Sequence, residues 1–588
     1  MIPAWLEKRH KFLWDAFHDS PFHFEDAAKI LKEKMQDSEN QINVFLSELR
    51  KRGWLEVEPD KDDARKKIYK LISKEEIISE TLAISKNELT RADLDSLLKA
   101  AADLIRTRVD YTFILLLLFY KRISDKWETE FDKAYKDALA DGLTESEARL
   151  EAKNSIYHDF DISQDLLWEN IRKDPAHLPE NFSRAMKALS ELNPELKDVF
   201  ENVDFVQFTS NRENAEILRQ LVELFSARSL HHVAPDILGD AYEWILKYFA
   251  PQKAKEGEIY TPREVIRLLV EILDPKPGDS VYDPAYGSGG MLITAYHHVE
   301  NEYGKEALNR LFLFGQEVNY KTLALSKMNL YIHDIRNAQV AQGDSLLYPK
   351  FKDKEGLKKF NVVIANPPWN QDGYDEETLK KGEFWKERFE YGFTPRQSAD
   401  WAWIQHMLAS AEERDGRVGV VIDNGCLFRG GKEKAIRSAV VSADRIEAVI
   451  LLPEKLFYNT GAPGAILILN KNKPADRKGK VLFINASQEY QQHPDVRKLN
   501  QLADSNIDKI VKAYREFKEI NGFSRIVGYD ELKDNDFNLN VTLYVFPEEE
   551  TENIDVLKEW EELRHLEKEI SETEAKIENY LKEIYQEE

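Results

Sequence analysis

Short runs of β-forming residues alternate with helical stretches from Ser229 to Tyr544, and this alternation limits the folds available to the chain. Such alternation is typical of a mostly parallel sheet with helices on both faces, which binds ligands at the carboxyl ends of its strands. We therefore predict an α/β fold with a doubly wound sheet. The expected strands are Ser280–Tyr282, Leu311–Gly315, Asn361–Ala365, Val418–Ile422, Ala448–Leu452, Ala465–Leu469 and Val481–Ile484.

The rest of the chain divides into three segments around this domain, which we place at residues 229–550. Residues 1–85 predict a winged-helix-like module, residues 86–228 a helical N-terminal domain, and residues 551–588 a C-terminal interaction helix. In that last helix, apolar residues recur at seven-residue spacing, which favours a coiled-coil-like partner, although a surface helix folded onto its own domain fits the pattern too. The heptad residues are Val556, Leu563, Ile570, Ile577 and Ile584, with Leu566 and Tyr580 between them.

The front module is expected to contain helices over Lys8–Phe17 and Glu25–Met35 and a third that opens at Ser38. Gln41 stands three residues after Ser38, which is the spacing of a capping box. Two strands, Trp54–Glu58 and Lys67–Leu71, complete the pattern. The module either contacts DNA directly or docks another protein. Its candidate phosphate-binding residues are Arg50, Lys51, Arg52, Arg65, Lys66 and Lys67.

Composition restricts the cellular setting and the partners. The most apolar run, Tyr111–Tyr120, is about half the roughly 20 residues that span a bilayer, so we expect a buried helix and no membrane association. The single cysteine, Cys426, excludes an internal disulfide and fits a cytoplasmic protein. A formal net charge of -24 opposes nucleic-acid binding by the whole surface. If the chain acts on DNA, either its basic residues cluster locally or a partner supplies most of the DNA contacts, and we favour the partner. An ordinary solvated acidic surface also fits this charge.

A glycine-rich turn follows the first expected strand. It begins at Asp283 and contains Gly287, Ser288, Gly289 and Gly290 before a helical stretch. Glycines let the backbone turn sharply and approach a ligand closely. The turn lacks the order of a dinucleotide-binding fingerprint, and its leading carboxylate suits a ligand that carries an amine.

Two more acidic residues stand at the ends of the next strands. Glu317 can accept hydrogen bonds from both ribose hydroxyls of a nucleoside, and Asp344 can accept one from an exocyclic adenine amine. Each residue alone is an ordinary surface carboxylate. Together with Asp283, they predict a nucleoside site along one edge of the sheet.

The segment Asn366-Pro367-Pro368-Trp369 follows the strand that ends at Ala365. Two consecutive prolines fix the turn and remove two N–H donors, so carbonyl groups face outward. The side-chain oxygen of Asn366 and the carbonyl of Pro367 can then accept from one NH2 group, while Trp369 stacks on a base. This suits an adenine flipped out of a duplex, with its amine aimed at a methyl donor. The chemistry needs no metal and no covalent nucleophile.

With these motifs the chain resembles the modification (M) subunits of type I restriction-modification systems from about Leu89 to Lys471. The segments Ala100–Asp103 and Phe119–Asp125 are similar to the family's helical domain. Further similar blocks are Ser398–Trp401, Leu427–Gly431 and Leu452–Phe457. Two features depart from the family pattern: Trp369 stands where phenylalanine is commoner, and the front module is additional.

The resemblance implies an adenine-N6 DNA methyltransferase that uses S-adenosyl-L-methionine (AdoMet) as its cofactor. Its catalytic residues would be Asn366 to Trp369, and Asp283, Gly287–Gly290, Glu317 and Asp344 would contact AdoMet. It also implies cofactor contacts from Glu258, Ile259, Tyr260, Thr261, Pro262 and Arg263. The implied partners are DNA, a specificity (S) subunit shared by two M subunits, and a restriction (R) subunit for cleavage.

Three other interpretations were weighed against this one. A stand-alone adenine-N6 DNA methyltransferase needs a target-recognition domain of its own, and the sequence after Tyr490 is short and acidic for one. Protein glutamine methyltransferases also use Asn-Pro-Pro and an aromatic residue, but they are much shorter. A non-enzymatic scaffold requires a damaged site, whereas every expected residue is present.

Overall fold

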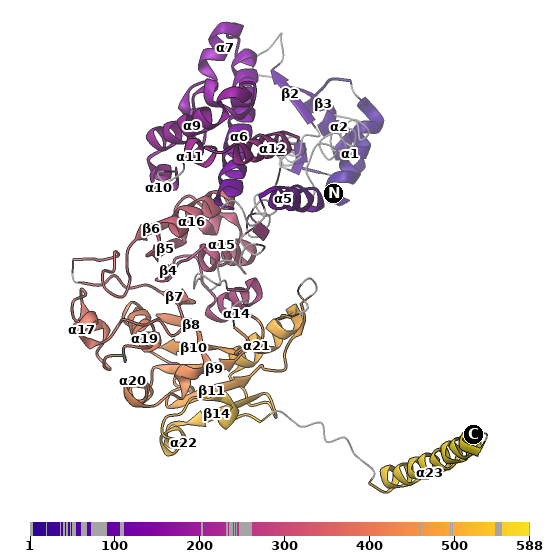
Figure 1. Ribbon diagram of the computed structural model, residues 1–588. Helices are drawn as coiled ribbons and strands as arrows, with labels where there is room; N and C mark the ends of the chain where they lie inside the picture. The colour runs from indigo at the N-terminus through magenta and orange to yellow at the C-terminus, as the bar shows by residue number, and fades with distance from the viewer. Residues whose placement is uncertain are drawn as a thin grey trace. The chain divides into compact units, whose positions relative to one another are not determined.

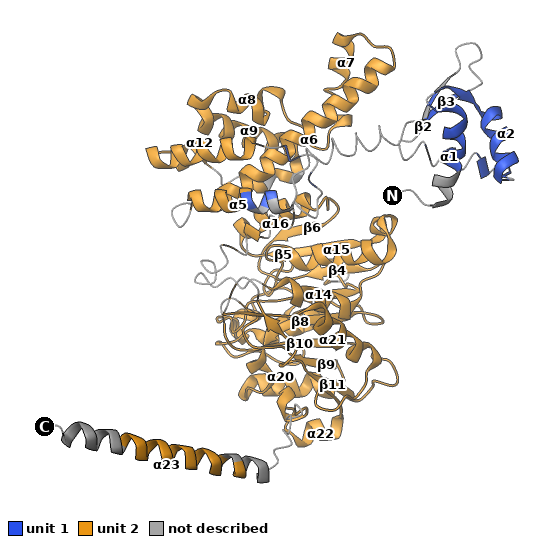
Figure 2. Cartoon of the chain, turned by 90° about the vertical axis from the view of Figure 1, so that its right-hand side faces the viewer, with its two compact units in different colours: residues 1–96, 228–234 blue, residues 97–227, 235–588 orange. Residues whose placement is uncertain are grey.

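The chain is described in a computed structural model, in which it separates into two compact units (Figure 2). One unit contains residues 1–96 and 228–234, and the other contains residues 97–227 and 235–588. The residues that the structure describes are 4–18, 20–35, 37–38, 41–42, 45–46, 49, 55–59, 67–71, 91–105, 111–200, 204–227, 229–230, 233, 239, 242, 244–245, 248, 261–354, 356–457, 460–493, 496, 498–546 and 556–586.

The first unit contains the front module. Its elements are α1 (Ala4–Phe17), β1 (Phe22–His23), α2 (Phe24–Met35), β2 (Leu55–Pro59) and β3 (Lys67–Leu71). The strands form a sheet in the order β1-β3-β2, and Leu31, Phe45 and Leu55 are buried in its core. The expected capping box is present, because Ser38 N donates to Gln41 Oε1 at 2.8 Å and Gln41 N donates to Ser38 Oγ at 3.4 Å. The basic residues Arg50, Lys51, Arg52, Arg65 and Lys66 lie outside the described residues.

The helical domain is built around the long helix α6 (Thr112–Ala140). The apolar run of the sequence lies in its first turns, where Ile114 to Tyr120 are buried, and Tyr120 packs against Trp168 and Phe182. Among the described residues, no helix combines the length and the apolar character that crossing a membrane requires. The other helices are α5 (Arg91–Ile105), α7 (Glu145–Glu151), α8 (Trp168–Arg172), α9 (Leu178–Leu192), α10 (Lys197–Phe200), α11 (Phe205–Phe208) and α12 (Arg212–Ser226).

Nine strands in the described part of the chain form one sheet, in the order β14-β11-β9-β10-β8-β7-β4-β5-β6 (Figure 1). Strands β4, β5, β6, β7 and β8 are parallel neighbours, whereas β10 runs antiparallel between β8 and β9. The seven expected strands are all present. The strands of the sheet are β4 (Ser280–Asp283), β5 (Phe312–Glu317), β6 (Gln339–Gln342), β7 (Val362–Ala365), β8 (Arg417–Asp423), β9 (Ile446–Leu451), β10 (Gly464–Asn470), β11 (Lys480–Asn485) and β14 (Ser524–Gly528).

Helices cover both faces of this sheet, as the doubly wound prediction requires. Alternate residues of each strand belong to different cores: Val281 packs with α14, α15 and α21, while Tyr282 packs in the core that contains α19 and α20. A strand whose residues are buried on both faces is nearly continuously apolar. The helices of this domain are α14 (Arg263–Leu273), α15 (Gly290–Tyr303), α16 (Tyr320–Ile332), α17 (Glu376–Leu379), α18 (Trp385–Arg388), α19 (Asp400–Ala409), α20 (Gly431–Ser442), α21 (Asp504–Glu516) and α22 (Tyr529–Asp534).

The last helix, α23 (Val556–Gln586), carries a row of exposed apolar side chains. Five of them are more than two-fifths exposed: Trp560, Leu563, Leu566, Ile570 and Ile577. An apolar row of this kind is typical of a surface that a partner covers.

Candidate active site

The candidate site lies at the carboxyl ends of four neighbouring strands. Asp283 ends β4, Glu317 ends β5, Asp344 follows β6 by two residues, and Asn366 follows β7 directly. The chain leaves β4 toward β5 and β6 on one side, and it later returns to β7 and β8 on the other. The crevice of a doubly wound sheet forms where the strand order reverses in this way. The topology therefore brings the four predicted side chains to the ligand-binding edge of the sheet.

The glycine-rich turn folds around Tyr286, a residue that sequence reasoning missed. Gly287 and Gly289 have φ angles of 54° and 88°, in the left-handed region that favours glycine. A Cβ atom on Gly289 would lie 2.6 Å from the Tyr286 hydroxyl, and one on Gly315 would lie 2.7 Å from the same ring. Gly315, just before Gln316 and Glu317, was the available sequence signal, because a strand glycine often marks a close approach.

Glu317 joins the glycine-rich turn to the start of the next helix. Its Oε2 atom accepts a hydrogen bond from Gly287 N at 2.9 Å, and its Oε1 atom accepts one from Asn319 N at 2.8 Å. A carboxylate oxygen can accept more than one hydrogen bond, so a ligand hydroxyl is a suitable partner for this side chain. The turn is also held by Asn329, whose Nδ2 atom donates to the Ser288 carbonyl at 3.0 Å.

Asp283 is buried, with 1% of its surface exposed. Its Oδ1 atom accepts from Ala285 N at 3.0 Å. Burial raises the pKa of the Asp283 carboxyl well above its usual range, and the negative charge of Glu317 raises it further. A cationic group placed beside Asp283 would have the opposite effect and favour the carboxylate.

Asp344 is already oriented by the protein. Its Oδ1 atom accepts from the backbone nitrogens of Leu346 and Leu347 at 2.9 and 3.1 Å, and its Oδ2 atom accepts from the Tyr374 hydroxyl at 2.8 Å. Tyr374 belongs to the segment after the Asn-Pro-Pro-Trp turn, so that segment contacts the predicted adenine acceptor. No pattern in the sequence indicates this contact.

The carboxamide of Asn366 is held at both of its ends. Asn366 Nδ2 donates to Thr261 Oγ1 at 2.7 Å, and Trp369 Nε1 donates to Asn366 Oδ1 at 2.9 Å. The Trp369 ring is half-buried and meets the Phe457 ring edge-on, with 4.8 Å between the ring centroids. Of the two prolines, Pro367 is buried and Pro368 is exposed. The side-chain oxygen has one remaining lone pair to accept a ligand amine.

The segment expected to contact the cofactor is described in part. Thr261 is half-buried against Asn366, Pro262 is buried before α14, and Arg263 is exposed as the first residue of that helix. Glu258, Ile259 and Tyr260 lie outside the described residues. In the described part of the chain, no group of three or more His, Cys, Asp or Glu side chains is arranged to hold a metal ion.

The sheet topology and these four strand ends are those expected of an AdoMet-dependent methyltransferase. Comparison with known proteins gives the family. The family model described as N-6 DNA Methylase matches residues 233–553, and the model described as HsdM N-terminal domain matches residues 94–225. The chain therefore belongs to the N-6 DNA methylase family, among the methylase subunits of type I restriction enzymes.

Two relatives from Methanocaldococcus jannaschii match along nearly the whole chain. The type I restriction enzyme MjaVIII methylase subunit is 45% identical over 98% of this chain and 97% of its own length. The MjaVII methylase subunit is 43% identical over 99% of this chain and 98% of its own. Among solved structures, the type I restriction-modification methyltransferase subunit from Streptococcus thermophilus superposes with a TM-score of 0.68 at 26% identity. That superposition covers 78% of this chain and 100% of the other.

Proposed function

We propose that this chain transfers a methyl group from AdoMet to N6 of an adenine flipped out of DNA, as the M subunit of a type I restriction-modification system. The observation that carries the proposal is the carboxamide of Asn366, which is hydrogen-bonded at both ends and lies at the same edge of the sheet as the acidic side chains predicted to bind a nucleoside. A fixed carboxamide presents its free lone pair in one direction, and positioning of this kind supplies much of the rate of a transfer reaction.

The hydrogen-bond acceptors at the strand ends suit AdoMet. Asp283 would face the ammonium group, Glu317 the ribose hydroxyls and Asp344 the adenine amine, with Gly287 to Gly290 and Thr261 to Arg263 beside them. AdoMet supplies an electrophilic methyl group. The tight packing of Gly289 and Gly315 on Tyr286 supports this assignment, because it fixes the turn between Asp283 and Glu317.

The target adenine would lie between the Asn366 turn and the Trp369 ring. Asn366 Oδ1 and the Pro367 carbonyl would both accept from its amine, which directs the nitrogen lone pair at the methyl group. Trp369 would stack on the base, as an aromatic ring does for a base extruded from a duplex.

Sequence specificity would come from a separate S subunit, with two M subunits per S subunit, and an R subunit would join for cleavage in the cytoplasm. The net charge of -24 and the exposed apolar row of α23 support this division of labour. We further propose the domain limits 1–85, 86–228, 229–550 and 551–588, with the last segment as the subunit-binding helix.

Mapping of N6-methyladenine in cells tests the proposal. Cells that express the chain with its neighbouring genes should methylate adenine at one DNA motif, and cells that express the chain alone should not. Asn366→Ala should abolish methylation, because the base loses the acceptor that orients its amine, and a misplacement of about 1 Å costs on the order of 100-fold in rate. Asn366→Asp keeps an acceptor of the same size and should leave residual activity.

Calorimetry and co-purification provide the controls for these variants. Asn366→Ala should bind AdoMet and assemble with its partners like the wild type, since its side chain is not part of the core. Normal methylation by this variant would show that the active site has been assigned wrongly. Motif-specific methylation by the chain alone would favour the stand-alone enzyme instead.

A further inference from the structure

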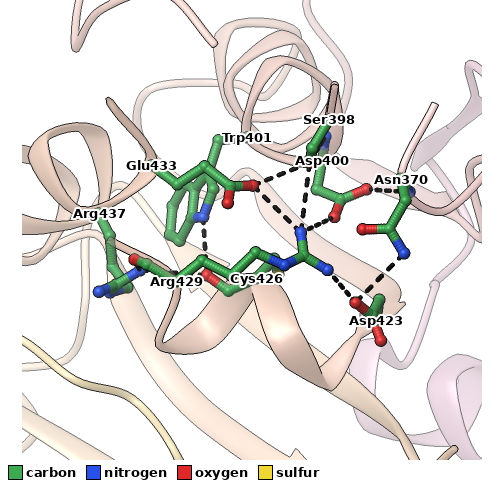
Figure 3. Close-up of polar contacts among 9 residues, drawn as sticks. All are labelled: Asn370, Ser398, Asp400, Trp401, Asp423, Cys426, Arg429, Glu433 and Arg437. Carbon is green, nitrogen blue, oxygen red and sulfur yellow. Dashed lines mark hydrogen bonds and ion pairs between the residues drawn. The ribbon is translucent and has the colours of Figure 1, made fainter. Parts of the chain in front are cut away.

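The residue after Trp369 is held in an unusual backbone conformation by two carboxylates (Figure 3). Asn370 has a φ angle of 53°, in the left-handed region that asparagine tolerates better than most other non-glycine residues. Its backbone nitrogen donates to Asp400 Oδ1 at 2.8 Å, and its side-chain Nδ2 donates to Asp423 Oδ2 at 3.3 Å. Asn370 itself is exposed, so these contacts belong to the turn and not to the core.

Arg429 joins these two carboxylates to a third. Its NH1 group donates to Asp400 Oδ2 at 3.0 Å and to Glu433 Oε1 at 3.3 Å, and its NH2 group pairs with Asp423. The three carboxylates come from three elements: the start of α19, the end of β8 and the first turns of α20. One guanidinium therefore fixes the groups that hold Asn370.

The backbone that carries Arg429 is fixed in turn by buried donors. The Arg437 NH1 group donates to the Arg429 carbonyl at 2.9 Å and to the Cys426 carbonyl at 3.2 Å. The indole nitrogen of Trp401 donates to the same Cys426 carbonyl at 3.0 Å. Arg437 and Trp401 are fully buried, so the backbone that carries Arg429 is anchored to the core (Figure 3).

Stability alone does not account for this arrangement. The side chains of Asp400 and Glu433 are 2% and 4% exposed, and burial raises the pKa of both carboxyl groups. Buried charge clusters are often less stable than an apolar filling of the same volume, because removing charges from water is costly. Backbone strain that the surroundings maintain is typical of functional sites. Two of the three carboxylates, Asp400 and Asp423, contact Asn370, which directly follows the residues that would bind the target base.

We propose that Asp400 and Arg429 are positioning residues that fix the Asn366–Trp369 turn through Asn370. This inference rests on the proposed function and deepens it. By holding the residue after Trp369 in one conformation, Asp400 sets the direction of the preceding turn and so of the Asn366 acceptor. Arg429 keeps the Asp400 carboxylate in the orientation that receives Asn370 N. Neither residue contacts the reacting atoms.

A matched pair of buried carboxylates separates positioning from a merely structural role. Asp400 binds one arginine and one N–H group. Glu447 is comparable: its Oε1 atom pairs with Arg477 at 2.7 Å, its Oε2 atom accepts from Asn470 Nδ2 at 3.1 Å, and its carboxylate also accepts from the Tyr514 hydroxyl. The Glu447 side chain is 3% exposed, but it lies near the start of β9, at the end of the strand away from the carboxyl ends that form the candidate site. Asp400→Asn and Glu447→Gln thus remove the same charge from similar environments.

The two variants are compared in the full-length complex purified with the neighbouring gene products, at saturating DNA and AdoMet. Asp400→Asn should lower the single-turnover methyl-transfer rate about 10- to 100-fold while the Kd for AdoMet stays within about twofold of the wild type. Glu447→Gln should lower the melting temperature about as much as Asp400→Asn does, but it should leave the methyl-transfer rate within about twofold of the wild type. An equal loss of rate in both variants, or no loss in Asp400→Asn, overturns the proposal.

Asn370 provides a second pair of variants that does not disturb the core. Asn370→Gly and Asn370→Ala both lose the side-chain contact with Asp423, but only glycine accepts the left-handed conformation without strain. We expect the rate to stay within about threefold for the glycine variant and to fall about tenfold for the alanine variant. Equal, wild-type rates for both would overturn the proposal even if Asp400→Asn failed to fold. Absence of adenine methylation by the wild-type complex would instead overturn the proposed function, and this inference with it.

Discussion

Trp369 carries an indole N–H that phenylalanine, the commoner residue at its position, lacks, and in this structure that donor has a specific partner. The indole N–H donates to Asn366 Oδ1, while Thr261 accepts from the other end of the same carboxamide. The side chain of Asn366 therefore cannot rotate without breaking both hydrogen bonds. A phenylalanine would stack on a base equally well but would leave the oxygen end of the carboxamide unrestrained.

We expect Trp369→Phe to lower the single-turnover methylation rate about fivefold. One neutral hydrogen bond contributes about 1 kcal/mol, which corresponds to a factor of this size. The Kd for AdoMet should not change, because in the proposed function the replaced ring would face the target base and not the cofactor. A variant with the wild-type rate would show that stacking alone, and not the indole N–H, is what Trp369 contributes.

Asp283 should make AdoMet binding depend on pH. In the ligand-free protein its raised pKa keeps the carboxyl protonated above the ordinary value of about 3.9. The sign follows from this: its contribution favours the folded state at low pH and is lost as the pH rises through the raised pKa. A bound ammonium group favours the carboxylate, so AdoMet binding should release a proton and should tighten as the pH rises through that pKa.

Calorimetry in buffers of different ionisation enthalpy measures this proton release. The observed binding enthalpy of the wild type should vary with the buffer below the raised pKa. Asp283→Asn has no proton to release and should show no such variation. A wild-type enthalpy independent of the buffer would mean that Asp283 does not face the ammonium group.

At the scale of the elements, the strands with buried faces could be predicted and the edge strands could not. Strand β7 is continuously apolar, and β9 is apolar apart from Glu447, because helices cover both faces of the sheet. By contrast, β6 is a polar edge strand with the sequence Gln-Val-Ala-Gln, and β14 is only partly buried. The direction of the strands could not be predicted either, because β10, which is antiparallel to its neighbours β8 and β9, has the same apolar pattern as they have.

The candidate site divides in the same way. Asp283, Glu317 and Asn366 could be placed at strand ends because each follows a recognisable apolar run, whereas Asp344 follows the short polar strand β6. The contacts of Tyr374 with Asp344 and of Asp400 with Asn370 each join residues that are 30 positions apart in the sequence. Such contacts arise only when the segment between β7 and α19 folds back on the sheet, and no local pattern specifies that path.

Helix α23 carries a prediction of its own. Deleting residues 554–588 should leave AdoMet binding intact, since the strand ends of the site do not include this helix. The deletion should weaken assembly with the specificity subunit, because it removes the exposed apolar row from Trp560 to Ile577 that the partner would cover. Size-exclusion chromatography of the mixed subunits measures the effect.

Single substitutions on α23 refine this experiment. Ile570→Ser removes an apolar side chain from the exposed row, whereas Lys568→Ser changes a charged neighbour outside the heptad positions. Only Ile570→Ser should shift the elution of the mixture toward free subunits. A normal complex from the truncated chain would show that assembly uses another surface.

For the whole molecule, the net charge of -24 favours a subunit that needs a partner over an enzyme that binds DNA alone, and DNA binding can test this. DNA affinity falls with salt in proportion to the number of phosphates that a protein neutralises. An acidic chain that relies on a partner should therefore bind DNA weakly by itself and show a shallow dependence on salt. The complex, with on the order of 6–10 phosphate contacts, should lose about 10³- to 10⁵-fold in affinity between 50 and 200 mM salt. Fluorescence anisotropy with one duplex measures both species under identical conditions.

Equal affinity and equal salt dependence for the chain and the complex would mean that the chain binds DNA through a basic face of its own. The specificity subunit would then contribute the choice of sequence and little of the affinity.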